Sequence, residues 1–193
     1  PDQGGVKLRK SYTFKRGDYA VKVRHEVVNG TAAPIAPQLY LQLARDGTVP
    51  SSSMFMGPTA FTGPSIYTDK GKFQKVDFSD IEKGKADHEK SADNGWIAMV
   101  QHHFVGAWLV GDKRERSFQT KREGTNLYST SMTLPLAPIA AGATQAVDAT
   151  LYAGPQEEKK REALAPGLEL VKDYGWVTIL AKPLFWLLDK LHG

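Results

Sequence analysis

The sequence contains no cysteine among its 193 residues. Disulfide bonds, thiol nucleophiles and cysteine-ligated metal sites are therefore excluded, whereas neither the cytosol nor the periplasm is excluded. No group of glycines has the spacing of a phosphate-binding loop or of a nucleophile elbow between a strand and a helix. The sequence thus offers no support for nucleotide chemistry.

The sequence also has no large excess of positive or negative charge. It contains 25 Lys and Arg and 21 Asp and Glu, which gives a net charge of +4. Nucleic-acid-binding domains usually gather positive charge on one face, whereas here bases and acids alternate along most of the chain. We therefore expect no nucleic-acid partner. The length, with 41% hydrophobic and 24% charged residues, favours a single folded domain.

Long apolar runs are missing as well, since a membrane span needs about 20 mostly apolar residues. The most apolar stretch, residues 176–193, is interrupted by Lys182, Asp189 and Lys190. At about 100° per residue, its large apolar side chains form one stripe of a helix, which Pro183 is expected to kink. The stripe consists of Trp176, Leu180, Leu184, Leu187 and Leu191. It faces either the membrane surface, which the Trp and Lys content favours, or the protein core.

Strand-like alternation is present instead through much of the chain. It is clearest in residues 19–27, where one side carries Tyr19, Val21, Val23, His25 and Val27 and the other carries Lys22, Arg24 and Glu26. Residues 39–43, 127–136 and 147–153 alternate in the same way, and residues 96–110 are rich in aromatic and branched side chains. Gly, Pro and Asn separate these runs without helical periodicity, which favours antiparallel sheets packed as a sandwich.

The composition changes after Pro155, where a charged helical turn is followed by the apolar stretch. We therefore predict an all-β fold, an antiparallel β-sandwich over residues 1–155, followed by a helical linker over 156–175 and an amphipathic α-helix over 176–193. Two charged stretches, 69–94 and 111–124, are expected to be solvated hairpins or loops. A partner-binding role for them is the second interpretation.

Residues that carry chemistry are scattered. His102 and His103 are adjacent, so on a strand they would point to opposite faces and could not share one metal ion. His88, between Asp87 and Glu89, lies in a charged stretch and is expected to be exposed. Nothing fixes the separation of the paired carboxylates, which are Asp77 with Asp80 and Glu157 with Glu158. We therefore predict no catalytic residue, no cofactor and no metal, and hence no enzyme.

Five segments carry a more specific signal. They are KRGDYAV at 15–21, GWIAMVQHHF at 95–104, LYAGP at 151–155, LAPGLELVKDYGW at 164–176 and KPLFWLLDKLH at 182–192. In this order they resemble the C-terminal part of the periplasmic domain in the YidC family of bacterial membrane protein insertases, up to the helix that precedes the membrane core. The resemblance covers nearly the whole chain, although residues 69–94 and 113–123 contribute little to it.

The resemblance implies a β-supersandwich similar to galactose mutarotase, at the periplasmic face of the bacterial inner membrane. In the family the KRGDYAV segment falls well inside the domain, so N-terminal strands are expected to be missing and a sheet edge to be open. The implied function is accessory: a binding and positioning module that assists insertion of inner-membrane proteins. The implied partners are SecD, SecF and the Sec translocon, nascent membrane protein clients, and the membrane surface through the C-terminal helix.

A carbohydrate-binding or aldose-epimerase-like domain is the alternative, because mutarotase-like sandwiches often bind sugars in a cleft. Trp96, Trp108, Tyr40 and Tyr128 are the aromatic residues that could stack on sugar rings. Aromatic residues in sandwich strands more often belong to the core. A saturable sugar site would separate this alternative from the binding module.

Overall fold

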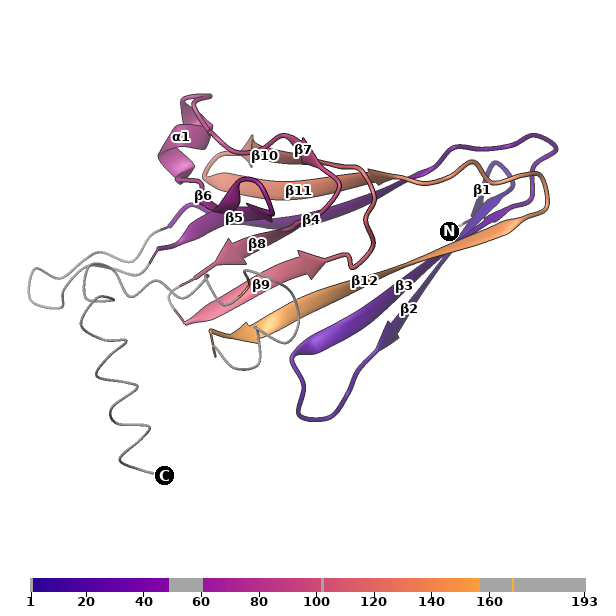
Figure 1. Cartoon of the computed structure of the whole chain (residues 1–193), viewed down its shortest axis with the longest axis horizontal. Helices are drawn as coiled ribbons and strands as arrows, with labels where there is room; N and C mark the ends of the chain where they lie inside the picture. Colours follow the sequence, from indigo (N-terminus) through magenta and orange to yellow (C-terminus); the bar gives the residue numbers. More distant parts are fainter. Residues whose placement is uncertain (1, 49–60, 102, 157–167, 169–193) are drawn as a thin grey trace, which may run out of the picture.

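The computed structural model describes residues 2–48, 61–101, 103–156 and 168. Strands dominate this part of the chain (Figure 1). The elements are β1 (Asp2–Gln3), β2 (Val6–Thr13), β3 (Ala20–Asn29), β4 (Gln38–Asp46), β5 (Gly63–Thr68), β6 (Lys72–Lys75), α1 (Phe78–Glu82), β7 (Ser91–Ala92), β8 (Trp96–Val100), β9 (Phe104–Leu109), β10 (Arg116–Gly124), β11 (Leu127–Pro135) and β12 (Thr144–Pro155).

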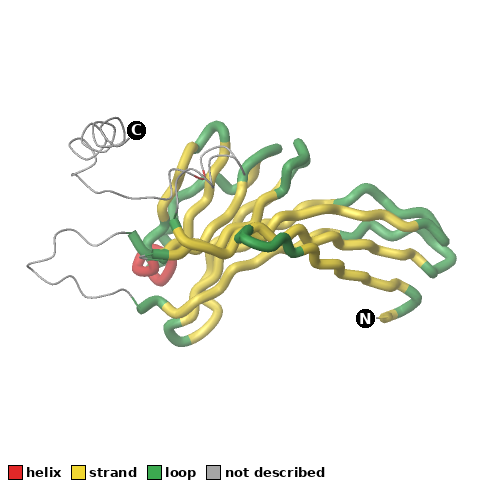
Figure 2. The backbone as a smooth tube through the Cα atoms, turned by 90° about the horizontal axis from the view of Figure 1, so that it is seen from below, coloured by secondary structure: helices red, strands yellow, loops and turns green. Residues whose placement is uncertain are grey.

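Two antiparallel sheets face each other. The larger has eight strands in the order β1-β2-β3-β12-β9-β8-β5-β6, and the smaller has four in the order β4-β11-β10-β7. In Figure 1 the smaller sheet lies over the central strands of the larger one, while β2, β3 and β12 extend beyond it. Figure 2 shows the same long strands reaching toward the N-terminus. The predicted all-β antiparallel sandwich is thereby confirmed.

The core between the sheets follows the predicted alternation. Val23 on β3 is 1% exposed, and it lies opposite Ala149 of β12, which is also buried. Leu39 and Leu41 of β4 meet Met132 and Leu134 of β11 on the inner face of the smaller sheet. Burial of these branched and aliphatic side chains stabilises the sandwich by roughly 1.5 to 3 kcal/mol for each fully buried residue.

The central strands of the larger sheet are buried on both faces. All five residues of β8 are buried, so its sequence reads as a continuous apolar run rather than an alternating one. On the outer face, Trp96, Ala107 and Tyr152 belong to a second apolar cluster that also contains Leu168. Leu168 therefore covers the outer face of the sheet from the segment that follows β12.

Both charged stretches are mostly exposed, as predicted, but each also contributes to the packed structure. Residues 69–94 contain β6 and α1, and Val76, Phe78 and Ile81 form a third apolar cluster with Met99 and Tyr128. A few well-spaced apolar side chains were enough to anchor a segment whose other residues stay mostly exposed. Residues 116–124 form β10, and Phe118 on that strand belongs to the core between the sheets.

Tyr19 also departs from its prediction. It precedes β3, is 39% exposed, and its ring packs edge-on against Tyr152 with centroids 6.4 Å apart. Since Tyr152 belongs to the outer cluster, Tyr19 lies outside the core that Val23 and Val27 enter. The turn before β3 breaks the alternation, because the two-residue period holds only within a continuous strand.

The predicted linker over 156–175 and the helix over 176–193 lie outside the described residues, except for Gln156 and Leu168. The same applies to the predicted stripe of Trp176, Leu180, Leu184, Leu187 and Leu191. Within the described ranges, no helix has the length and apolar character needed to cross a membrane.

Candidate functional site

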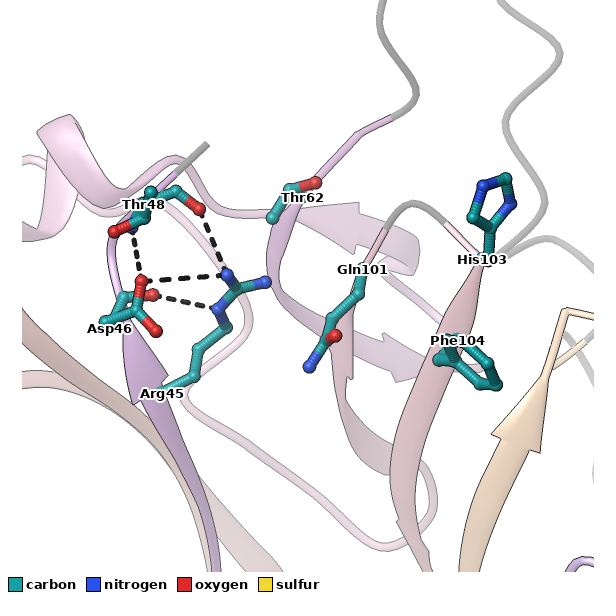
Figure 3. Close-up of a pocket in the computed structure, with 7 residues that line it drawn as sticks. All are labelled: Arg45, Asp46, Thr48, Thr62, Gln101, His103 and Phe104. Carbon is teal, nitrogen blue, oxygen red and sulfur yellow. Dashed lines mark hydrogen bonds and ion pairs between the residues drawn. The ribbon is translucent and has the colours of Figure 1, made fainter. Parts of the chain in front are cut away.

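A cavity of about 580 Å³ opens at the end of the sandwich where β4 and β8 end and β9 begins (Figure 3). One wall comes from the end of β4, and the other comes from the residue before β5, the turn between β8 and β9, and the start of β9. The lining residues are Arg45, Asp46, Thr48, Thr62, Gln101, His103 and Phe104.

The side chains of Arg45 and Asp46 are held by hydrogen bonds to the backbone at the end of β4. Arg45 Nε donates to the Asp46 carbonyl oxygen at 2.8 Å, and Nη2 donates to the Thr48 carbonyl oxygen at 3.0 Å. The Asp46 Oδ1 atom accepts from the Thr48 amide at 2.9 Å. Hydrogen bonds from Thr48, chiefly from its side chain and then from its backbone, lower the pKa of Asp46. Asp46 is therefore an anion at neutral pH and a poor proton donor.

The opposite wall ties β12 to the turn between β8 and β9. The Gln101 amide donates to the Phe104 carbonyl oxygen at 2.8 Å, and the Gln156 amide donates to the His103 carbonyl oxygen at 3.0 Å. The Gln156 side chain also donates to the Gln101 carbonyl oxygen. Phe104 is 56% exposed at this rim, so the cavity presents a mixed apolar and polar surface to solvent.

The aromatic residues proposed to stack on sugars lie on separate surfaces. Trp96 stacks on Tyr67 under the outer face of the larger sheet, with ring centroids 5.5 Å apart. Tyr128 packs on Phe78 between the sheets, at 4.9 Å. Trp108 donates through Nε1 to the Gln42 carbonyl oxygen at 3.2 Å. Tyr40 is 53% exposed, and its strand register places it on the outer face of the smaller sheet.

These four residues therefore form no common platform. Trp96 and Tyr128 belong to the apolar clusters, as the core interpretation of strand aromatics predicts. Trp108 covers a carbonyl group of β4, the strand at one edge of the smaller sheet.

His88 is buried, contrary to its prediction, with 5% of its surface exposed. Its Nδ1 lies 2.7 Å from the Glu89 carbonyl oxygen, and its Nε2 lies 3.2 Å from Lys90 Nζ and 3.3 Å from Thr120 Oγ1. This arrangement fits a neutral ring that donates through Nδ1 and accepts at Nε2. Burial lowers the pKa of His88, and Lys90 adds to that effect, while the bond to Glu89 opposes it.

The side chains around His88 do not form a metal site with it. Glu89 pairs with Lys70 Nζ at 2.7 Å. His103 is exposed at the cavity rim, and His102 lies outside the described residues. Across the described part of the chain, no three His, Asp or Glu side chains gather as a metal site.

Arg116 is a buried cation that the sequence did not reveal. Its side chain is 0% exposed, and it donates to the carbonyl oxygens of Arg114 and Gly95 at 3.0 Å, of Val110 at 3.1 Å, and of Asp112. Desolvation lowers its pKa, and the Asp112 carboxylate opposes that effect. Arg116 therefore organises the loop between β9 and β10, and its guanidinium group donates to the protein backbone and not to solvent. Its position among other charged residues hid it in the sequence.

The comparisons with known proteins identify the chain. The family model of the YidC periplasmic domain matches residues 1–187. The chain belongs to the YidC periplasmic domain family. The resemblance found in the five sequence segments is thereby confirmed. The YidC family assignment extends through the residues that follow β12.

Relatives agree with this assignment. The chain is 56% identical over 192 residues to a membrane protein insertase YidC of Janthinobacterium sp. (strain Marseille), covering 99% of this chain and 34% of that protein. It is 54% identical over 192 residues to the same-named protein of Cupriavidus taiwanensis, covering 100% of this chain and 34% of that protein. The chain thus spans about a third of the length of the curated relatives it matches.

Solved structures show weaker likeness. A galactose mutarotase related enzyme from Lactobacillus acidophilus is 8% identical, with a TM-score of 0.46, covering 77% of this chain and 61% of that chain. A putative aldose 1-epimerase from Klebsiella pneumoniae is 12% identical, with a TM-score of 0.33, covering 86% of this chain and 54% of that chain. Likeness at this level gives no information on ligand or reaction.

Proposed function

We propose that this chain is the periplasmic accessory domain of a bacterial membrane protein insertase, and that it binds and positions Sec components or client chains beside the inner membrane. The observation that carries the proposal is the match to the YidC periplasmic domain over residues 1–187. Relatives named as insertases, 51–56% identical over nearly the whole chain, support it. The carbohydrate alternative is not favoured, because the relatives carry the insertase name and the four aromatic residues do not converge.

An edge strand offers a first binding surface. β2 pairs with β3 along its whole length, but on its other side, among the residues that the structure describes, only Val6 and Lys7 have a partner strand, which is β1. Leu8 and Tyr12 on this strand are 41% and 52% exposed. A partner segment adding to such an edge would gain backbone hydrogen bonds from the ladder and apolar contacts from these side chains.

Residues 83–90 offer a second surface, because they follow α1 and carry exposed charges beside a buried anchor. Lys83 and Lys85 are exposed, whereas His88 is buried and holds the segment against Thr120 of β10. Mixed charge on a fixed loop suits a transient partner better than an obligate one.

The test is site-specific photocrosslinking in cells that carry this domain within its full-length insertase. A crosslinker at Tyr12 on β2 or at Lys83 after α1 should capture SecD, SecF or a client chain. The control position is Tyr40, which is also exposed but lies on the outer face of the smaller sheet. Crosslinks that consistently avoid both surfaces would contradict the proposal.

A separate measurement addresses the carbohydrate alternative. Titration calorimetry of the chain with galactose and with glucose should give no saturable heat. A stoichiometric site for either sugar would favour the alternative instead.

A further inference from the structure

Three chain segments meet at one end of the larger sheet, which we call the exit end because the chain leaves β12 there. Pro155 of β12 lies opposite Phe104 of β9, and Tyr152 lies opposite Ala20 of β3. The turn between β2 and β3, residues 14–19, therefore lies beside the end of β12. Figure 1 shows this turn and the arrowhead of β12 on the same side of the molecule.

The turn at residues 14–19 is well ordered by its own bonds. The Asp18 amide donates to the Lys15 carbonyl oxygen at 3.1 Å, and Gly17 has a φ of +78°, a value that glycine adopts without strain. The Asp18 carboxylate accepts from the Ala20 amide at 3.0 Å. The one acid of the turn is therefore directed at its own backbone.

Tyr19 fixes the turn to β12. Its carbonyl oxygen accepts from the Ala153 amide at 3.0 Å, and its ring rests on Tyr152. A Cβ atom at Gly154 would lie only 2.5 Å from Tyr19 Cγ, so the ring occupies the space that this glycine leaves. The turn is thus held in a defined position relative to the point where the chain leaves the sheet.

The turn presents an apolar side chain between cations. Phe14 is 75% exposed, the largest exposed fraction among the exposed large hydrophobic residues of the described chain. Lys15 and Arg16 follow it directly, and no ion pair in the described ranges involves either of them. Residues 3–17 contain five Lys or Arg and no Asp or Glu, in contrast to the mixed charge elsewhere. Phe104 adds a second exposed aromatic ring at the same end.

We propose that the exit end rests on an anionic phospholipid surface, with Phe14 entering the headgroup region and Lys15 and Arg16 pairing with lipid phosphates. Aromatic residues flanked by Lys and Arg are the combination that suits a membrane interface. The tip of a tight turn has no free ladder groups for a peptide strand, so lipid is favoured over an acidic peptide. This inference rests on the proposed placement beside the inner membrane.

The absence of cysteine permits a direct test. A Thr13→Cys variant, labelled with an environment-sensitive fluorophore, reports from the exposed end of β2, beside the turn. Anionic vesicles of about 70% phosphatidylcholine and about 30% phosphatidylglycerol are compared with uncharged vesicles of phosphatidylcholine alone. The label should brighten with the anionic vesicles, the response should fall with added salt, and the same label at Tyr40→Cys should not respond.

Matched charge reversals then separate the turn from general charge. Each Lys or Arg near an anionic surface is worth about fivefold in binding. Lys15→Glu with Arg16→Glu should therefore weaken vesicle binding by at least about 20-fold, and Phe14→Ser should weaken it severalfold. Lys121→Glu with Arg122→Glu makes the same change in net charge at another adjacent, exposed Lys-Arg pair and should change binding by less than about threefold. Because the substituted residues are exposed, circular dichroism should show an intact sheet in every variant.

Three outcomes would overturn the inference: equal losses in the two charge variants, binding without any response from the label at position 13, or a label response to an acidic peptide but not to vesicles. Photocrosslinking is scored separately. If crosslinks to Sec components or clients form while the substitutions in the turn leave vesicle binding unchanged, only the lipid contact is rejected and the proposed function stands. If the turn binds vesicles but no partner crosslinks form, the lipid contact stands and the partner proposal fails.

Discussion

Val23 shows how a residue predicted from alternation enters the core. It lies between Tyr12 of β2 and Ala149 of β12 in the strand register, and it is 1% exposed. Replacing it with Asp places a carboxylate in an apolar layer without a partner. We expect Val23→Asp to lower the free energy of unfolding by several kcal/mol, on the order of 3 to 5.

Urea unfolding followed by circular dichroism measures this change. Lys22→Asp, at an exposed position on the same strand, is the matched control and should cost less than about 1 kcal/mol. An unchanged midpoint for Val23→Asp would remove Val23 from the core.

Arg116 is the residue whose role depends most on the fold. A Met at this position would keep much of the volume but leave the carbonyl groups of Gly95 and Val110 without their donor. Each buried acceptor left unsatisfied costs about 1 to 3 kcal/mol, so Arg116→Met should destabilise the chain by at least about 2 kcal/mol. Lys113→Met, at an exposed position in the same loop, should be close to neutral in the same thermal or urea measurement. Equal effects of the two changes would contradict this role.

Two buried histidines predict how stability depends on pH. Burial is the main cause that lowers the pKa of both His25 and His88, with Lys10 and Lys90 respectively adding to it. The unfolded chain therefore takes up protons at a higher pH than the folded chain. Stability should be fully present above the ordinary His pKa of about 6.5 and should fall as the pH drops from there toward the lowered values.

Urea midpoints between pH 7.5 and 5.0 test this sign. His25→Leu removes one of the two titrating groups and should flatten the dependence. A steeper fall in the His25→Leu variant would be inconsistent with a neutral buried ring.

At the scale of elements, the predicted helix over 176–193 remains a prediction. Its stripe includes Leu184 and Leu187, and each leucine buried in lipid is worth roughly 1.5 to 3 kcal/mol. Changing both to Ser should weaken binding of the chain to liposomes and leave the β-sheet signal intact. Liposomes that bind neither form, or a double change that unfolds the sandwich, would make the helix a core element instead.

Alternation predicted β3, β4 and β12 but missed β10, whose buried residues are only Arg116 and Phe118. β3, β4 and β12 were found because polar residues mark their second face. β8 is buried on both faces, so its sequence showed β-propensity without a period. Residues 69–94 were predicted to be solvated because their charges outnumber their apolar residues, yet Phe78 and Ile81 are enough to fix α1 against Tyr128.

At the scale of the whole molecule, Leu168 links the sandwich to the residues that follow it. It is 0% exposed in the outer cluster, beside a small-residue row in which Ala98 pairs with Ala107. Leu168→Ala should destabilise the chain by roughly 2 to 5 kcal/mol, the usual cost of a core cavity. Leu127→Ala, at a position 41% exposed, is the control for a surface leucine.

Thermal unfolding reports the result. We expect the Leu168 variant to melt at a lower temperature than the Leu127 variant. If both leucine variants behave alike, the Leu168 side chain does not belong to the outer cluster.

The sequence by itself determined the all-β class, the inward residues of β3 and β4, and the family, because local periodicity and ordered motifs are properties of the chain alone. Tertiary structure decided which surfaces those residues share. In the sequence, each of four aromatic residues looked equally able to stack on a sugar ring. Strand order and register placed them on different surfaces; they are Trp96, Trp108, Tyr40 and Tyr128. Tertiary structure also decided that Tyr19 and Phe104 both lie beside the end of β12, since pairing between distant strands depends on packing that no local pattern encodes.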